Sequence, residues 1–517
     1  MRALIIACVL FLVQLQAAEA KWLRADTQHF ILYSDGRESD LRDDAQKLER
    51  FDQMMRVVTG IGDDEGQVRL TVYFVRSPES VRALYGGDKS KARNVAGFYS
   101  ATASGAFAVT PRSVEYAIDD RHYAETTDTI LFHEYTHHLM LQYFPSSYPA
   151  WYVEGFAEFS GNSRVEKDGV VKYGLPNVGR AYSLLNEASL PIETLLSASV
   201  ETLPRSQIEG LYARGWLLTH YLNRDPSRKG QLVTYLKAMA GGTPSIEAAR
   251  SAFGDLKKLQ KDMSNYLTSR MSFRVLSGFD PLPQTITIRA LDPGENDAVL
   301  HQFKLSRGTA PEEREPLASA LRALAKQYPA NAYVLTALAE AELDANHLTA
   351  AEAAADAALS ISPGTVRAQL WKGLANLRAL REANSTDAAK WQAARGWVVK
   401  ANRGNPEDAL PLLVFYQSYT LEGKKPPPVA LSGLAKAVDL VPQDSGTRFV
   451  YASALAREKR FAEAIKVIKP VAYDPHGGRS ATFARNAITR LEQARDKGTA
   501  FDGADLEEGA DDGDDDK

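Results

Sequence analysis

Two short segments constrain the fold of this chain more than any other part of its sequence. In the first, His133 and His137 stand four residues apart with Glu134 between them, and the apolar residues around them recur at helical spacing. In the second, Glu154 and Glu158 stand four residues apart among large apolar residues. Carboxylates are rarely buried unless they are paired or bound to a metal. The two segments therefore predict neighbouring helices that bring these side chains together.

The first segment, residues 127–138, has the pattern H-E-x-x-H. Thr127 or Asp128 can cap the start of its helix. Positions four apart lie on one side of a helix, so both imidazoles can converge on one metal ion. The glutamate beside them lies close enough to accept a proton from a water at that metal, as in zinc hydrolases. The alternative interpretation is a helix with two coincidental histidines.

The second segment argues against coincidence. Gly155 has no side chain, so its helix can approach a neighbour closely. A catalytic zinc ion takes three protein ligands and leaves one position for water, and two histidines with one glutamate are a known set. Glu154 lies 17 residues after His137, which is enough for a tight loop over 143–149 and an antiparallel return. We therefore predict one Zn²⁺ site between the two helices.

The H-E-x-x-H segment, followed by W-x-x-E-G-x-A-E at 151–158, resembles the gluzincin metallopeptidases, whose broad plan is that of thermolysin. More narrowly, it is similar to exported bacterial proteins with a peptidase-MA-like domain and C-terminal tetratricopeptide repeats. The likeness covers about residues 22–270, including a strand at 30–34 and a helix at 212–222. It implies an α+β domain of the gluzincin type.

The resemblance also implies a role for each site residue. His133, His137 and Glu154 would hold the zinc ion. Glu134 would act as the general base. Glu158 matches the place of a carboxylate that orients one of the ligand histidines in the family.

Three further features are candidates for the same site. Tyr212 sits where gluzincin-like chains often carry a tyrosine that hydrogen-bonds the oxyanion, and core packing is an equally good interpretation of it. His138 points roughly 140° away from His133 on a helix, so we expect it to be partly exposed and not to reach the metal. Residues 97–109 form either the edge strand that pairs with an extended substrate or a plain core strand.

The chain begins with a segment typical of a secretory signal peptide, residues 1–20. Arg2 supplies a positive charge, the apolar run over 3–13 is too short to span a bilayer, and Ala-Glu-Ala precedes Lys21. The single cysteine, Cys8, lies inside this segment. We therefore expect an exported bacterial protein, periplasmic or secreted, with no disulfide and no transmembrane segment after signal cleavage.

Residues 21–271 have strand patterns at 29–36 and 68–75, followed by mostly helical patterns. Strands first and helices after suggest an α+β domain, which we predict to be the peptidase-MA-like zinc domain. Residues 284–291 then alternate like a strand between prolines. We predict a small β connector over 272–306.

Residues 307–497 are rich in Ala and Leu, with prolines at the spacing of helix pairs. Pro329 to Pro363 spans 34 residues, the tetratricopeptide period. The next interval, to Pro406, spans 43 residues and is too long for one regular repeat. Glu342 departs from the large apolar residue usual at its position. We predict an all-α tetratricopeptide-like solenoid, with a non-repeating helical bundle as the alternative.

Charge is unevenly distributed along the chain. The net charge is −4, of which residues 502–517 contribute −8. The remainder, about +4 over some 500 residues, is no footprint for nucleic acid, which needs a concentrated basic patch. Because the end of the chain has few large apolar residues, we predict that 498–517 form a disordered acidic tail.

Together these features predict an exported zinc metallopeptidase that hydrolyses peptide bonds in a peptide or protein substrate. The helical repeats suggest a protein partner as well. An alternative is a tetratricopeptide-repeat scaffold that binds peptides, with an inactive or structural zinc domain. An intact Glu134 argues against that alternative, because a structural site needs no base. Zinc-dependent hydrolysis of a non-peptide amide or ester is a third candidate.

Overall fold

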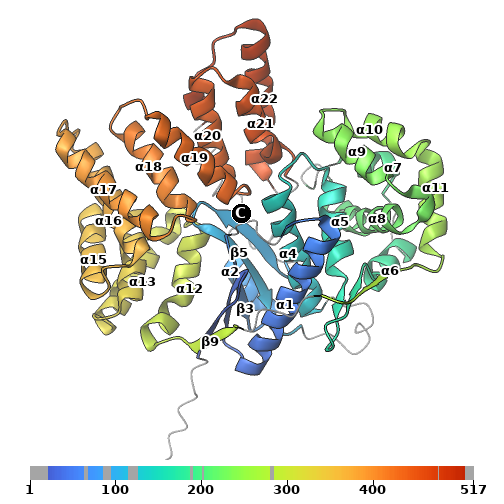
Figure 1. The fold of residues 1–517 in the computed structure, drawn as a ribbon, viewed down its shortest axis with the longest axis horizontal. Helices are drawn as coiled ribbons and strands as arrows, with labels where there is room; N and C mark the ends of the chain where they lie inside the picture. The colour runs from blue at the N-terminus through green and yellow to red at the C-terminus, as the bar shows by residue number, and fades with distance from the viewer. Residues whose placement is uncertain are drawn as a thin grey trace, which may run out of the picture.

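The computed structural model describes residues 21–62, 68–85, 95–114, 126–186, 190–198, 200, 203–279, 285–474 and 477–506. The predicted signal peptide, with Cys8, lies outside these residues. A sheet lies at the centre of the molecule, with a helical region on its right in Figure 1 and an arc of helical hairpins on its left and above it. Over the described ranges, no helix has the length and apolar character needed to cross a membrane.

The central sheet has six strands in the order β4-β5-β3-β2-β1-β9. Strands β2, β3 and β5 run parallel, whereas β4, β1 and β9 pair antiparallel with their neighbours. β4 therefore lies at one edge, and β5 lies inside the sheet. The bounds are β1 Leu23–Asp26, β2 Phe30–Ser34, β3 Leu70–Val75, β4 Phe98–Thr102, β5 Gly105–Pro111 and β9 Thr287–Ala290.

Helices cover both faces of this sheet. On one face, α1 (Glu38–Thr59) packs against α4 (Thr127–Tyr143) through stacked rings of Phe51 and Phe132, whose centroids are 4.0 Å apart. On the other face, Phe303 of α12 (Pro293–Arg307) contacts the rings of Tyr73 and Phe107 at 4.9 and 5.2 Å. α2 (Pro78–Tyr85) lies on this second face with α12. Helix α12 leads into the arc of helical hairpins, which we call the helical array (residues 293–497). This helix thus shares a core with the sheet.

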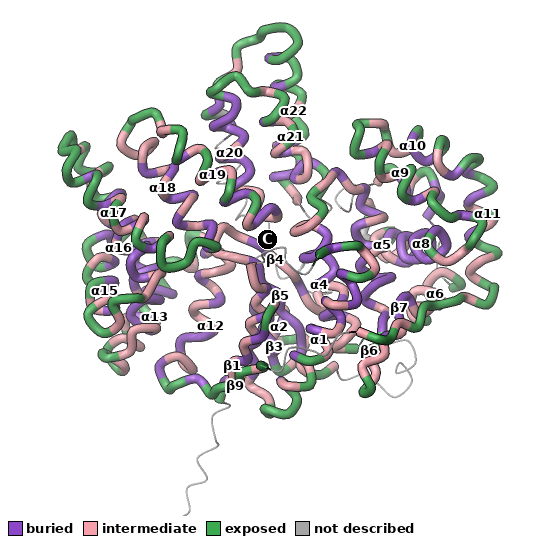
Figure 2. The backbone as a smooth tube through the Cα atoms, viewed as in Figure 1, coloured by how far each residue is buried: buried purple, intermediate pink, exposed green. Residues whose placement is uncertain are grey.

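The helical region beside the sheet is built around α5 (Ala150–Gly161) and α8 (Arg205–Arg224), and α8 is buried along most of its length (Figure 2). A Cβ atom at Gly155 would lie 2.3 Å from the Gly215 carbonyl oxygen, so only glycine allows this crossing. The close approach predicted for Gly155 is thus confirmed, with α8 as the neighbour. The remaining elements are β6 Arg164–Val165, β7 Val171–Tyr173, α6 Val178–Asn186, α7 Ile192–Ser197, α9 Gln231–Ala240, α10 Ser245–Phe253 and α11 Leu256–Leu267.

The segment predicted as a β connector over 272–306 contains strands, but it does not form a separate unit. Its first strand, β8 (Arg274–Leu276), completes a three-stranded sheet with β6 and β7. Its second strand, β9, pairs with β1 at the edge of the main sheet. The rest of the segment belongs to α12. Alternation in the sequence indicates a strand but not its partner, and both partners here lie more than 100 residues away.

Antiparallel helices form most of the described residues after α12. The 34-residue unit from Pro329 to Pro363 contains the pair α14–α15, and the longer interval after it contains α16 and α17, each of 17 residues. The predicted all-α solenoid is confirmed. The bounds are α13 Pro311–Gln327, α14 Ala332–Asp344, α15 Leu348–Ile361, α16 Val366–Glu382, α17 Ala388–Gly404, α18 Ala409–Leu421, α19 Pro428–Leu440, α20 Ser445–Arg457, α21 Phe461–Ala472 and α22 Gly478–Lys497.

Glu342, which departs from the repeat pattern, has polar partners inside the array. It is buried, accepts hydrogen bonds from Arg322 at 2.6 and 2.7 Å, and lies 2.8 Å from His347 Nδ1. A carboxylate replaces a large apolar residue here because two cationic or polar neighbours compensate for its burial.

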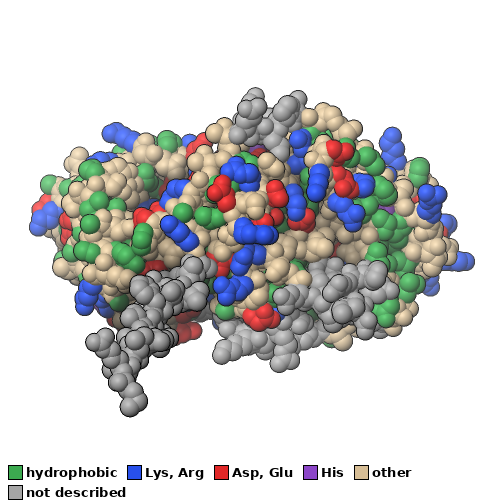
Figure 3. All heavy atoms as spheres, turned by 90° about the horizontal axis from the view of Figure 1, so that it is seen from below, with side chains coloured by type: hydrophobic (Ala, Val, Ile, Leu, Met, Phe, Trp, Pro, Cys, Tyr) green, Lys and Arg blue, Asp and Glu red, His purple; other side chains and the backbone are tan. Residues whose placement is uncertain are grey.

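Basic and acidic side chains are mixed on the surface. On the face shown in Figure 3, Lys and Arg lie interspersed with Asp and Glu. Nucleic-acid binding needs a concentrated basic patch, so this face does not have the required charge distribution.

The predicted disordered tail is wrong for its first part. A short 3₁₀ helix, η4 (Gly503–Leu506), packs on α20, and Leu506 is buried among Phe449, Leu455 and Leu491 of the last hairpins. One leucine among acidic residues is a weak signal in sequence, but it fills a pocket that the folded hairpins supply. Residues 507–517 lie outside the described residues.

Leu506→Ala is expected to lower the free energy of unfolding of the last hairpins by about 2 kcal/mol or more, because it leaves a cavity in a packed cluster. Removal of residues 507–517 is the matched control and should leave stability unchanged, since seven of these eleven residues are acidic. Urea unfolding followed by circular dichroism measures both. Equal stability of the Leu506→Ala variant and the wild type would show that docking of η4 adds nothing.

Candidate metal centre

Helix α4 carries the two histidines. Its N-cap is Thr126, one residue before the first of the two predicted caps, and the Thr126 hydroxyl accepts a hydrogen bond from the Thr129 N–H at 3.2 Å. The helix then runs for 17 residues. It brings the imidazoles of His133 and His137 to the same side, as the spacing predicts.

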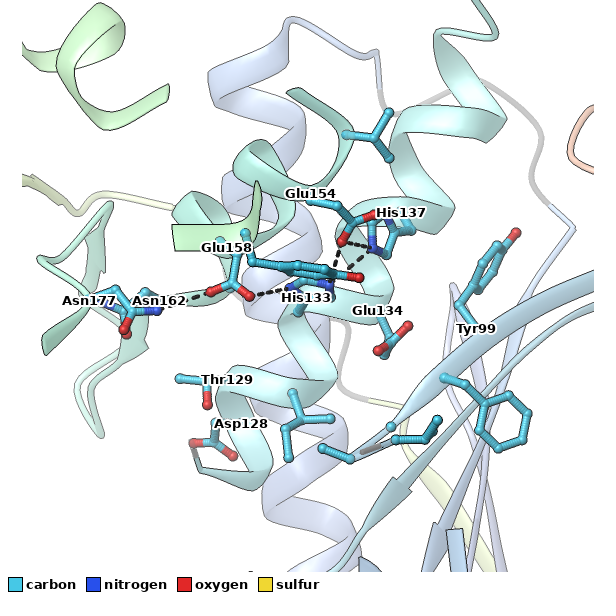
Figure 4. Close-up of a pocket in the computed structure, with 18 of the residues that line it drawn as sticks. Tyr99, Asp128, Thr129, His133, Glu134, His137, Glu154, Glu158, Asn162 and Asn177 are labelled. Atoms are coloured by element: carbon cyan, nitrogen blue, oxygen red, sulfur yellow. Dashed lines mark hydrogen bonds and ion pairs between the residues drawn. The ribbon is translucent and has the colours of Figure 1, made fainter. Parts of the chain in front are cut away.

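Three potential ligand atoms converge on one point (Figure 4). Nε2 of His133 lies 3.0 Å from Nε2 of His137. Oε2 of Glu154 lies 3.6 Å from the first of these nitrogens and 3.7 Å from the second. A tetrahedral zinc ion with bonds of about 2.0–2.2 Å holds its ligand atoms about 3.3–3.5 Å apart. The three side chains therefore come close to the zinc geometry, and shifts of a few tenths of an ångström would bring their ligand atoms to it.

The electrostatics of the cluster also favour a cation. Burial by itself lowers the pKa of His133, but Glu154, Glu158 and Glu134 outweigh this effect and raise that pKa to about 9. Three carboxylates around a half-buried imidazole thus create a negative potential. A bound divalent cation would neutralise this negative potential. The imidazoles of His133 and His137 would then be neutral, as metal ligation requires.

Glu134 lies beside the ligand atoms and is half-buried in a large cavity, and Figure 4 shows its carboxylate on the side facing the sheet. Gly97, just before β4, permits this arrangement. A Cβ atom there would lie 2.4 Å from Ile130 Cγ2 and 3.6 Å from Glu134 Cγ. The glycine thus allows the edge strand to pass close to α4 on the side of the glutamate.

Glu158 stands behind His133. Its Oε1 lies 3.7 Å from His133 Nδ1, an ion-pair distance longer than a hydrogen bond. Arg180 and Asn177 donate hydrogen bonds to the same carboxylate at 2.7 and 3.1 Å. Arg180 also pairs with Glu209 at 2.7 Å. The structure therefore places Glu158 where the resemblance implies an orienting carboxylate.

Sequence reasoning missed Arg180 and Asn177. Both lie at or near the start of α6, about 20 residues after Glu158, and no spacing or motif connects them with it. Only the packing of α6 against α8 brings them to the carboxylate. The sequence offered one signal, an arginine about 20 residues after the predicted buried Glu158. Such a pair is too common in sequences to identify a contact.

Glu158→Ala is expected to weaken zinc binding by about 10- to 100-fold, because an outer carboxylate orients the histidine and raises its basicity. Competition with a chromophoric chelator measures this affinity. Glu166→Ala is the matched control: Glu166 lines the same cavity but pairs with Lys172 at 2.6 Å, away from the ligands. Equal affinities of the Glu158→Ala variant and the wild type would remove Glu158 from the site.

Tyr212 lines the same cavity and is half-buried. Burial, together with the nearby carboxylates of Glu154 and Glu158, raises the pKa of its hydroxyl well above the usual value. The Arg180 guanidinium lies over its ring, 5.5 Å from the centroid. The hydroxyl therefore stays protonated and can donate a hydrogen bond, and its role toward the oxyanion stays a prediction beside core packing.

His138 differs from the expectation of partial exposure. It is 2% exposed, and its Nδ1 lies 3.3 Å from the hydroxyl of Tyr99 on β4. Burial, with a smaller effect of Arg56, lowers the pKa of His138 to about 3. As predicted it faces away from the metal ligands, but the sheet covers this side of α4 instead of solvent. Tyr99, which lines the cavity, was also missed from sequence.

A second cluster of metal-type side chains in the described residues is already occupied by protein partners. His29 Nδ1 lies 2.7 Å from Glu49 and 3.3 Å from Asp52. Asp52 is paired with Arg56 at 2.9 Å and accepts a short hydrogen bond from Tyr135. This cluster is a buried ion-pair network that joins β2 to α1 and α4.

No protein-family model matches this chain, and no curated protein matches it. Similar solved structures include a thermophilic tetratricopeptide-repeat protein of Thermus thermophilus, with 18% identity over 39% of this chain and 98% of that one, at a TM-score of 0.32. Another is YrrB, described as a tetratricopeptide-repeat protein with an unusual peptide-binding site, with 22% identity over 38% and 93%, at a TM-score of 0.26. The gluzincin resemblance of residues 22–270 stays a prediction.

Proposed function

We propose that this protein is an exported zinc-dependent metallopeptidase. The observation that carries the proposal is the convergence of His133, His137 and Glu154, with ligand atoms 3.0–3.7 Å apart, beside Glu134 in a large cavity. A structural zinc site usually closes its fourth position with another protein ligand. Among the described residues, three side chains here could serve as ligands, and Glu134, a potential proton acceptor, lines the same cavity beside them.

The residues of the chain would divide the reaction among them. Zinc, when bound, would polarise the scissile carbonyl and lower the pKa of a water molecule. Glu134 would take the proton of the attacking water and deliver it to the nitrogen of the leaving amine. The Tyr212 hydroxyl would donate a hydrogen bond to the carbonyl oxygen as charge develops there. Glu158, held by Arg180, would keep His133 in its orientation.

The size of the cavity favours a polymer over a small amide or ester. Its volume is about 1580 Å³. Sites for small molecules usually enclose about 300–1,000 Å³. The edge strand β4 lines it from Phe98 to Ala101, so one wall offers the backbone groups with which an extended peptide pairs.

A peptide-binding scaffold is the second candidate. The helical array occupies more than a third of the chain, and stacked helix pairs commonly present a concave surface to partners. In that case the metal cluster would serve folding alone. The two functions differ in one respect, because only the peptidase requires the carboxylate of Glu134.

Metal analysis followed by a digest tests the proposal. The purified protein is expected to contain about one zinc per chain. It should also cleave members of a quenched peptide library, lose this activity with a chelator, and regain it with added zinc. Mass spectrometry of the exported protein is expected to find Lys21 at or near its N-terminus. Metal-free protein without any cleavage would favour the scaffold.

A further inference from the structure

The helical array does not extend away from the metal site but returns to it. The side chain of Gln142, five residues after His137 on α4, donates a hydrogen bond to the Leu440 carbonyl at 3.3 Å. Its carbonyl oxygen accepts one from Gln443 at 2.9 Å. The α19–α20 turn is thus attached to the helix that carries both histidines, 300 residues away in sequence.

The inner side of the array holds the turn between β4 and β5. Arg367 of α16 donates to the Ser104 carbonyl at 2.9 Å, and Thr102 donates to the Ser306 carbonyl at 3.2 Å. Ala103, at the tip, packs against a buried cluster formed by α18, α19 and α20. The surface on which a repeat protein usually receives a partner is therefore partly occupied by this chain's own hairpin.

The last repeats instead contribute side chains to the cavity of the metal site. Burial, with a smaller effect of the Asp474 carboxylate, raises the pKa of the Tyr99 hydroxyl on β4 well above its usual value. The cavity that contains His133, Glu134 and His137 is lined on this side by Gln443, Ser445, Val471, Asp474, Gly477 and Ser480. One part of the cavity lining thus comes from α4 and β4, and another part comes from the α19–α20 turn and from described residues at or beside α21 and α22.

We propose that the α19–α20 turn and the described residues at α21 and α22 that line the cavity form a wall of the substrate path, so that the enzyme accepts extended, unfolded polypeptide and rejects folded domains. The inference rests on the proposed peptidase function. A polypeptide that reaches Glu134 along β4 would lie between this edge strand and the array residues that line the cavity, and the hairpin contacts hold this spacing. A cavity of about 1580 Å³ is too small to hold a folded domain, whereas it can hold a single extended segment.

Ser445 is the position best suited to test this wall. It is half-buried, lines the cavity, and lies at the start of α20. Cys8 is the single cysteine, so in a Cys8→Ser background an introduced cysteine is the only thiol. Asn486→Cys, on the exposed side of α22, is the matched control. Serine to cysteine changes little in volume, so folding should be preserved.

The first measurement is activity after attachment of a bulky maleimide. Labelled Ser445→Cys is expected to cleave an unfolded protein about 10-fold or more slowly than before labelling, because the label displaces the chain from its path. Its zinc content should be unchanged, and labelled Asn486→Cys should be unaffected. The wild type should cleave a given sequence in an unfolded protein but not in a loop of a folded domain. Unchanged activity after labelling, or cleavage of the folded loop at an equal rate, would overturn the proposal.

The second measurement does not depend on catalysis. In the Glu134→Gln background, an unfolded polypeptide at about ten times its Kd should slow maleimide labelling at Ser445→Cys by about 10-fold and leave Asn486→Cys unchanged. Slower labelling without any cleavage by the wild type would contradict the peptidase function while supporting the wall. Equal labelling rates with and without polypeptide would overturn the wall itself.

Discussion

Glu134→Gln is expected to bind about one zinc per chain and to lose about 10²- to 10⁴-fold in kcat, the usual effect of a lost general base. Glutamine keeps the shape of the side chain and one hydrogen-bonding oxygen, but it cannot accept the proton of the attacking water. The position of Glu134, beside the three ligand atoms and not among them, is the reason that metal binding should survive. Zinc content and hydrolysis of a quenched peptide are measured on the same preparation.

Two controls make this result specific. Glu166→Gln changes a carboxylate that lines the same cavity but pairs with Lys172, and it should retain activity. The thermal unfolding of Glu134→Gln should match that of the wild type with zinc present. If the Glu134→Gln variant cleaves as fast as the wild type, Glu134 is not the base. If neither the wild type nor the Glu134→Gln variant cleaves any peptide, the scaffold function is favoured.

Glu154→Ala is expected to lose both metal and activity. It removes one of three ligands and leaves two histidines. Zinc affinity should therefore fall by more than the roughly 100-fold expected when a residue that only orients a ligand is lost. The wild type should also be stabilised by zinc, because an ion that binds only the native state adds to its stability. This zinc-dependent rise in melting temperature should be absent in the variant. Metal analysis and calorimetry with and without zinc measure the two effects.

The comparison with Glu158→Ala distinguishes a ligand from an orienting group. Both carboxylates are buried on α5, four residues apart. Loss of Glu158 should leave a stoichiometric but weaker zinc site, whereas loss of Glu154 should leave none at micromolar zinc. Retention of one tightly bound zinc by Glu154→Ala would require another third ligand and would contradict the site described above.

The sequence by itself determined the local parts of the site and the type of each region. Four-residue spacing puts His133 and His137 on one face of a helix, and likewise Glu154 and Glu158. This relation does not depend on the fold of the remaining chain. Gly155 indicated a close helix crossing, and the 34-residue proline interval indicated a helix pair. These inferences depend on periodicity within about 40 residues. Neighbouring residues impose that periodicity directly, so it can be read without knowledge of the fold.

Only the tertiary structure decided what lies around these elements. Three contacts join segments whose sequences carry no common spacing or motif. Arg180 and Asn177 hold Glu158, β4 covers His138, and Leu506 packs on the last hairpins. The same holds for β9, which was expected in a connector but completes the main sheet. The return of the array to α4 through Gln142 and Gln443 links residues 301 positions apart. Such contacts arise when preformed faces find complementary partners, and the free energy of that packing depends on the whole fold rather than on any local stretch.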